Sequence, residues 1–115
     1  MPAKFEISRS GKNNEFYFHL KATNGEIILR SQGYKDLSSA KKGIASVQTN
    51  AIVDMRYETK KAKNGESFFD LHSRNSKIIG TSQMYKEESG LKKGVTSVKK
   101  NAPTAKVVDY KPAAE

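Results

Sequence analysis

The chain has 115 residues, with 21 Lys and Arg against 12 Asp and Glu, so its formal net charge is +9. It has no Cys, which excludes disulfides, thiolate catalysis and zinc or iron–sulfur sites held by Cys. No stretch approaches the roughly 18 apolar residues of a membrane-spanning helix, and residues 1–5 lack the apolar segment of a secretory signal. We therefore expect a small cytosolic protein that does not enter the membrane.

The basic charge permits binding to nucleic acid or to another anionic surface. It is a weak indication, because only four of the basic residues are Arg and the rest are Lys. Lys lacks the planar, two-pronged donor group with which Arg holds phosphates and guanine bases. Nucleic acid is therefore a possible partner that the composition does not favour.

The first elements along the chain have the alternating pattern of β-strands. We predict strands over residues 4–9, 15–22 and 26–32, and the dipeptide Asn24-Gly25 predicts a hairpin turn between the last two. A helix is predicted next, because Leu37, Ala40, Ile44, Val47 and Ala51 recur at helical spacing. Asp36 or Ser38 can cap its N-terminus.

The chain then repeats itself at an offset of 51 residues. Between residues 31 and 51, 12 of 21 positions are identical to those of residues 82–102, and the match persists more weakly upstream. Phe5-Glu6 pairs with Tyr57-Glu58 when one residue is dropped. The second copy has Asn64-Gly65 and Asn75-Ser76 as hairpin signals, and its helix carries Leu91, Val95, Val98 and Ala102 on one face, with Glu87 or Ser89 to begin it.

Two Gly residues, Gly43 and Gly94, fall at matching positions inside the predicted helices. Each costs about 1 kcal/mol relative to Ala. Their repetition predicts close packing of the helices on the sheet.

A short strand is predicted after each helix, at Ile52-Val53-Asp54 in the first copy and Val107-Val108-Asp109 in the second. No Gly or Pro interrupts residues 52–60, so we expect them to be continuously extended over roughly 30 Å. Such a segment can pair in one half of a sheet and begin the next half. Each unit of about 55 residues buries too little surface to be stable alone, which favours one shared sheet.

The motifs together resemble the YegP-like family of small bacterial proteins of unknown function. They are Asn24-Gly25-Glu26-Ile27-Ile28, Ser31-Gln32-Gly33-Tyr34, Gly43-Ile44, Ser46-Val47 and Ser97-Val98-Lys99-Lys100-Asn101-Ala102-Pro103. The resemblance covers residues 4–110. It implies an α+β fold of two tandem β-β-β-α-β repeats that share one antiparallel sheet, with their C-terminal strands exchanged and both helices on one face.

The expected organisation is one globular domain of two repeat units, residues 1–54 and 55–110, followed by a disordered tail at residues 111–115. Because the tandem form supplies both halves of the sheet, a monomer is expected. The chain departs from the family motifs at Asn75-Ser76-Lys77, which stands where the first copy has Asn24-Gly25-Glu26.

The face of the sheet without helices is the first candidate binding surface. It is expected to display two aromatic rings, two imidazoles, a carboxylate and an ammonium group: Tyr17, His19, Lys21, Phe68, Asp70 and His72. Such a face can bind a flat ligand by stacking, although ordinary cross-strand packing of the aromatic rings is the favoured explanation of these residues. The two His residues do not align between the repeats, and we expect no metal site from them.

The Lys pairs on the helices are the second candidate surface, and the residues concerned are Lys41, Lys42, Lys92, Lys93, Lys99 and Lys100. They could contact the phosphates of a polyanion, or form the solvated face of an amphipathic helix. Lys60-Lys61-Ala62-Lys63 forms a basic hairpin tip that also protects a sheet edge.

No catalytic motif is present in the sequence. We find no Gly-rich phosphate loop, no nucleophile elbow and no His-Glu helix motif, and we expect neither enzymatic activity nor a cofactor. The favoured function is a non-catalytic binding or accessory module that uses the helix-free sheet face for a protein or small-molecule partner. The alternative is a low-specificity nucleic-acid or polyanion binder.

Overall fold

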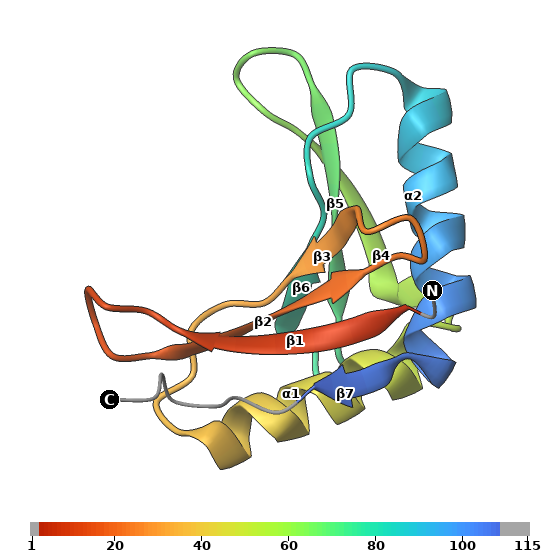
Figure 1. Ribbon diagram of the computed structural model, residues 1–115. Coiled ribbons are helices and arrows are strands. Elements are labelled where there is room, and N and C mark those ends of the chain that lie inside the picture. The colour runs from red at the N-terminus through yellow and green to blue at the C-terminus, as the bar shows by residue number, and fades with distance from the viewer. Residues whose placement is uncertain (1–2, 109–115) are drawn as a thin grey trace.

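The same order of elements occurs twice in the computed structural model, which describes residues 3–108 (Figure 1). The first copy consists of β1 (Lys4–Arg9), β2 (Phe16–Lys21), β3 (Ile27–Arg30) and α1 (Leu37–Asn50). The second consists of β4 (Tyr57–Lys61), β5 (Ser67–His72), β6 (Ile78–Thr81), α2 (Glu88–Asn101) and β7 (Lys106–Val108). Short 3₁₀ turns, Asp54–Arg56 and Ala102–Thr104, follow the two helices.

All seven strands form one sheet in the order β4-β5-β6-β3-β2-β1-β7, and both helices pack on the same face of it (Figure 1). The two repeats meet where β3 pairs antiparallel with β6, through the single registered pair Arg30 and Thr81. The predicted fold class, with two tandem repeats sharing one sheet, is confirmed. The sheet is mixed rather than wholly antiparallel, because β7 runs parallel to β1.

The C-terminal strand of the second repeat therefore pairs with the first strand of the first repeat. Val107 lies opposite Phe5, and the Lys106 amide donates a hydrogen bond to the Ala3 carbonyl over 3.2 Å. The chain between β1 and β7 includes nearly the whole protein, so nothing restricts the direction of their pairing. A parallel pair is possible for this reason.

The strand predicted at residues 52–54 is absent, and the expectation of a continuous extended segment over residues 52–60 is wrong. Val53 ends a turn after α1, a 3₁₀ turn occupies Asp54–Arg56, and only then does β4 begin. The first repeat's segment leads directly into β4. A strand cannot lie parallel beside the strand into which it continues, because that arrangement needs a crossover of about a dozen residues.

The core lies between the sheet and the two helices. Phe5, Phe18, Leu20, Phe69 and Leu71 are fully buried on the helix side of the sheet. The predicted apolar faces of the helices meet them, through residues that are buried or packed against the core: Ala40, Ile44, Val47, Ala51, Leu91, Val98 and Ala102, with Leu37 and Val95 at the margin. The rings of Phe5 and Phe18 contact edge to face at 5.9 Å.

The predicted signals at turns and helix ends are largely present. Asp36 caps α1 by accepting a hydrogen bond from the Ser39 amide over 2.7 Å. Gly25 and Ser76 have φ angles of 84° and 68°, as the predicted hairpin turns require. Glu87 occupies the N-cap position of α2 but makes no capping hydrogen bond.

The predicted tail at residues 111–115 lies outside the described residues. Among residues 3–108, neither helix has the length and apolar character needed to cross a bilayer.

The close packing predicted at the two helix Gly residues is confirmed. A Cβ atom at Gly43 would overlap the Tyr34 hydroxyl group and lie 3.0 Å from the Phe18 ring, and one at Gly94 would overlap the Tyr85 hydroxyl group. Tyr34 is stacked on Phe18 at a centroid distance of 6.0 Å. The two aromatic rings therefore hold the helix at a distance that only Gly permits.

We predict that Gly43→Ala destabilises the protein by roughly 1–3 kcal/mol, because the steric overlap exceeds the gain of about 1 kcal/mol in helix propensity. Urea unfolding measures the change. Ala45→Gly, at an exposed position of the same helix, is the control, and we expect it to cost only about 1 kcal/mol. A Gly43→Ala variant more stable than the parent chain would contradict the close contact.

Candidate functional site

Polar side chains form a continuous row across the helix-free face of the sheet. In sheet order, the register aligns Glu58, Asp70, Thr81, Arg30, His19 and Glu6. Equivalent positions of the two repeats contribute the two halves, which meet at Arg30 and Thr81. The positions in the row are therefore related by the repeat, but the residue types are not all the same. His19 of the first repeat is matched by Asp70 of the second.

The first half of this face is organised around the Glu6 carboxylate. His19 Nε2 lies 2.9 Å from Glu6 Oε1, Lys21 Nζ lies 3.0 Å from the same oxygen, and Lys4 Nζ lies 3.1 Å from Oε2. The hydrogen bond with His19, and then that with Lys21, lowers the pKa of Glu6 to about 2. The predicted residues His19 and Lys21 are thus already satisfied by a carboxylate of the same protein.

The second half is organised around Asp70, whose side chain is 4% exposed. Lys60 Nζ lies 2.5 Å from Asp70 Oδ2, and the Thr81 hydroxyl group donates to Asp70 Oδ1 over 2.7 Å. The hydrogen bond to Asp70 raises the pKa of Lys60. His72 Nε2 lies 3.2 Å from Glu58 Oε1.

Three possible metal ligands come together in this second half. One ligand atom each from Glu58, Asp70 and His72 lies within 4.8 Å of the others. Both oxygens of Asp70 are already bonded, to Lys60 and Thr81, so the buried carboxylate is satisfied by the protein itself. We assign no metal to this cluster.

The six predicted residues of this face do not converge on one position. His19 and Asp70 lie on β2 and β5, separated by two strands and hence by roughly 14 Å. Tyr17 accepts a hydrogen bond from Asn13 Nδ2 over 3.1 Å, and Phe68 lies opposite Lys60. Sequence reasoning missed Glu6 and Glu58 as the centres of the charged groups, although the match of Phe5-Glu6 with Tyr57-Glu58 was the signal that could have found them.

The helix Lys residues have different surroundings. Lys99 bonds to Asp54 and lies 5.7 Å from the centre of the Tyr57 ring, so it supports the chain after α1. Lys41, Lys92, Lys93 and Lys100 are exposed on the outer sides of the helices. Lys42 also lines a large cavity beside α1.

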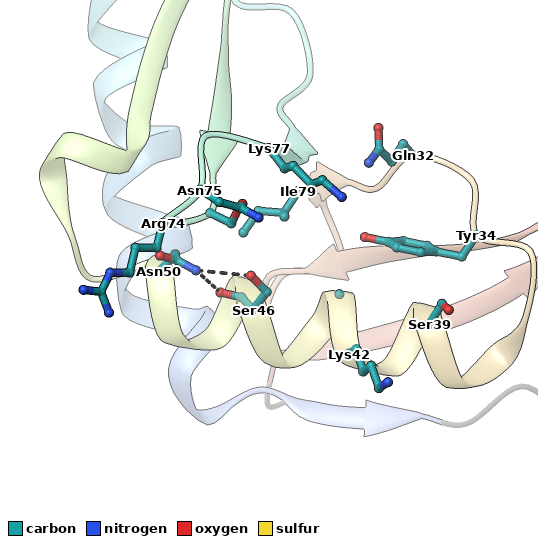
Figure 2. Close-up of a pocket in the computed structure, with 12 residues that line it drawn as sticks. Gln32, Tyr34, Ser39, Lys42, Ser46, Asn50, Arg74, Asn75, Lys77 and Ile79 are labelled. Carbon is teal, nitrogen blue, oxygen red and sulfur yellow. Dashed lines mark hydrogen bonds between the residues drawn. The ribbon is translucent and has the colours of Figure 1, made fainter.

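That cavity is an open groove of about 790 Å³ between α1 and the turn that joins β5 to β6 (Figure 2). Its lining residues are Gln32, Tyr34, Ser39, Lys42, Gly43, Ser46, Asn50, Ser73, Arg74, Asn75, Lys77 and Ile79. We refer to it as the α1 groove. One wall comes from the first repeat and the other from the second.

The α1 groove has three cationic side chains and no carboxylate in its lining. Lys42, Arg74 and Lys77 are all exposed, and none forms an ion pair within the part of the chain that the structure describes. Figure 2 shows Lys77 and the Tyr34 hydroxyl group extending over the cavity from opposite walls, whereas the charged ends of Lys42 and Arg74 point away from it at its rim. The groove lining therefore carries positive charge and no carboxylate of its own, and Asp36, just before α1, interacts electrostatically with Lys42.

Tyr34 supplies a neutral donor within the α1 groove. Its ring is held by Phe18 and its hydroxyl group lies against Gly43. Burial raises the pKa of Tyr34, so the phenol stays protonated at neutral pH. At the end of the groove, Asn50 Nδ2 donates to the Ser46 carbonyl over 2.8 Å.

The second repeat has a counterpart groove at the equivalent position beside α2. It is lined by Ala22, Asn24, Glu26, Ile28, Tyr85, Gly90, Lys93, Gly94 and Ser97, and its volume is about 300 Å³. Glu26 stands where the α1 groove has Lys77, and Gly90 stands where it has Ser39. Gln83 Nε2 donates to Glu26 and lies 3.5 Å from the Tyr85 hydroxyl oxygen.

The two grooves have therefore diverged in charge and size while keeping the same Tyr and Gly pair. Arg74 and Lys77 of the α1 groove were not among the residues predicted from the sequence. The signal was present, because Asn75-Ser76-Lys77 differs from Asn24-Gly25-Glu26 at the charged position. What the sequence did not indicate is that this turn lies opposite the helix of the other repeat.

Comparison with protein families finds two successive matches to the domain of unknown function DUF1508, over residues 12–58 and 62–109. A UPF0339 protein of Acinetobacter baylyi is 50% identical over 109 residues, which cover 95% of this chain and 97% of that protein. The UPF0339 protein YegP of Escherichia coli K12 is 47% identical over 95% of this chain and 98% of its own length.

Two solution NMR structures have the same fold. The UPF0339 protein of Shewanella oneidensis gives a TM-score of 0.87 at 44% identity, with 95% of this chain and 92% of that chain covered. The structure of Escherichia coli YegP, described as a protein of unknown function, gives a TM-score of 0.88 at 47% identity, with 95% and 93% covered.

The charged group around Glu6 predicts how stability depends on pH. Because the pKa of Glu6 is lowered from 4.5 to about 2 on folding, the ionised carboxylate stabilises the fold above pH 4.5. That stabilisation is lost as the pH falls through about 2. We expect Glu6→Gln to lower the free energy of unfolding by about 1 kcal/mol at neutral pH, and the difference from the parent chain to vanish at the acid end.

Urea unfolding of both proteins across this pH range measures the effect. Glu58→Gln is the matched control from the second repeat, and we expect a smaller change because this side chain is 56% exposed. A Glu6 carboxyl group that titrates near 4.5 in an NMR experiment would contradict the proposed hydrogen-bonded arrangement.

Proposed function

We propose that this protein, which belongs to the DUF1508 family of domains of unknown function, is a non-catalytic binding protein that holds a small anionic ligand in the α1 groove. The observation that carries the proposal is the lining of the groove, in which three cationic side chains face no carboxylate. An anionic ligand bound between Lys77 and Tyr34 (Figure 2) would meet positive charge that no carboxylate of the lining offsets.

The size of the groove favours a small molecule. Its volume of about 790 Å³ lies within the range of roughly 300–1,000 Å³ that is typical of small-molecule sites. The hydroxyl and amide groups of Ser39, Ser46 and Gln32 add neutral hydrogen-bond partners, as such sites usually do. A phosphate ester or a carboxylate is the ligand chemistry that these groups suit best.

The lining of the groove favours binding over catalysis. It includes no His, Asp, Glu or Cys, so it supplies no general base and no activated nucleophile. Burial raises the pKa of Tyr34 further above neutral pH, so its phenol is a neutral hydrogen-bonding group and not a base. The groups present bind and orient an anion but do not move a proton at neutral pH.

The α1 groove is favoured over the helix-free sheet face because of how charges are paired. On the sheet face, Glu6 and Asp70 neutralise the neighbouring Lys residues. A ligand would therefore have to compete with ion pairs that the protein already makes. Partner binding by that face stays a prediction.

Nucleic acid is the alternative partner, and the arrangement of the Lys residues does not favour it. Lys99 is held by Asp54, and the remaining helix Lys residues are spread over two helices. A polyanion would contact many of them equally. A ligand of the α1 groove would depend on only a few residues.

We predict that Lys77→Glu weakens binding of pyrophosphate at least roughly tenfold, because it replaces a charge-assisted hydrogen bond with repulsion. The measurement is a titration followed by backbone amide shifts in NMR spectra. We expect the shift changes to concentrate around Tyr34, Lys42 and residues 73–77. Lys93→Ala, in the counterpart groove, is the control and should leave the affinity unchanged.

Equal weakening by Lys77→Glu and Lys93→Ala would contradict a specific groove. A short DNA duplex that binds more tightly than pyrophosphate, with an affinity that falls steeply as salt rises, would instead support the polyanion alternative.

A further inference from the structure

The two ends of the sheet differ in a way that the repeat makes visible. At one end, β7 covers the outer edge of β1, with Lys106, Val107 and Val108 paired to Lys4, Phe5 and Glu6. At the other end, β4 is equivalent to β1, but no strand of the described chain pairs with its outer edge. The position that β7 fills beside β1 is therefore vacant beside β4.

The backbone of β4 offers unpaired hydrogen-bonding groups at this vacancy. Thr59 lies opposite Phe69 of β5. The backbone of Phe69 is bonded on its other side, towards β6. The Phe69 amide donates to the Ser82 hydroxyl group, and the Phe69 carbonyl accepts from the Ser82 amide. Thr59 is therefore not hydrogen-bonded to β5 at this pair, and its own amide and carbonyl point outward. By the alternation of a strand, the Tyr57 carbonyl also points outward, whereas its amide already donates to the Asp54 carbonyl.

Exposed apolar side chains precede β4 along the chain. Met55 is 86% exposed and Ile52 is 65% exposed, and they are the two most exposed large apolar residues of the described chain. Both come from the segment that leads into β4. Their repeat-equivalent region before β1 and β7 has instead the buried residues Ala3 and Ala105.

We propose that the outer edge of β4 binds an extended segment of a partner protein, which adds to the sheet as an eighth strand parallel to β4. The model for this contact is β7 on β1, so the segment is expected to carry neighbouring β-branched apolar residues, as Val107 and Val108 do. Backbone hydrogen bonds supply the affinity of such strand addition, and the apolar side chains supply its selectivity.

The docking region is short and lies at the beginning of β4. Lys60 and Lys61 end the strand, and charged residues of this kind protect a sheet edge from further pairing. The added strand therefore faces Tyr57–Thr59, through the Tyr57 carbonyl and the Thr59 amide and carbonyl, next to the turn that carries Met55. This edge is separate from the α1 groove and does not depend on it.

A synthetic peptide with the sequence of residues 102–108 of this chain is the probe, because it is a strand known to fill the equivalent position. Added at millimolar concentration to the full-length protein, it is expected to shift the backbone amide signals of residues 55–59 in a saturable manner. Thr59→Pro removes an outward amide while leaving the pairing with β5, so this variant should fold and lose the binding.

Met55→Ser is the second variant, and we expect a several-fold loss of affinity without any change of the backbone. Met84→Ser is the control, because it alters an exposed Met that follows β6 instead of leading into β4, and it should leave binding unchanged. Three results would overturn the proposal. The first is that the shift changes map to residues 4–6, where the peptide would displace β7. The second is that a folded Thr59→Pro variant still binds fully. The third is that the protein associates with itself through β4.

Discussion

The connection between α1 and β4 is the constraint on which the asymmetry of this protein depends. Residues 51–56 join the first helix directly to the first strand of the second repeat. They are too few to form a strand and then cross over to lie parallel to β4. The first repeat consequently ends in a 3₁₀ turn, whereas the second ends in β7. Two similar units therefore form a sheet in which β7 covers the edge of β1 and no described strand covers the edge of β4.

The surroundings of α1 and α2 show how the same constraint is met locally. Gln48 on α1 donates to the Ala105 carbonyl just before β7, over 3.4 Å. Its repeat-equivalent on α2 is Lys99, which bonds to Asp54 and lies over the Tyr57 ring. A neutral contact that supports a crossing strand has thus become an ion pair that supports a turn. The change follows from the backbone, since a different chain segment lies beside each helix.

Local patterns were sufficient to predict most of the fold. The alternating strands, the hairpin turns and the apolar faces of the helices depend on neighbouring residues, and each is visible within a short stretch of sequence. The parallel pairing of β7 with β1 joins residues about 100 positions apart, and no local pattern records it. The prediction at residues 52–54 failed for a related reason: Ile52-Val53 has the composition of a strand, but the fold leaves no place for one.

The candidate site was less predictable, because it is formed between the repeats. His19 and Asp70 were correctly placed on one face, but the sequence did not show that Glu6 and Lys60 pair with them there. Lys42 was recognised only as one of several surface Lys residues. Its significance arises from Arg74 and Lys77, which the fold brings to the same groove from the other repeat.

A groove formed between repeats gives the fusion of two units a chemical consequence. In a symmetric dimer of a single unit, both grooves would contain identical residues, so a substitution in one would appear in the other. In one chain, the two turns are encoded separately. Lys77 can then make one groove cationic while Glu26, held by Gln83, gives its counterpart a carboxylate.

The two grooves share the contacts of Tyr34 with Gly43 and of Tyr85 with Gly94. These contacts hold each helix against the sheet, and they cannot diverge without disturbing the core. The duplication therefore separates a conserved packing role from a charge that each groove can set independently.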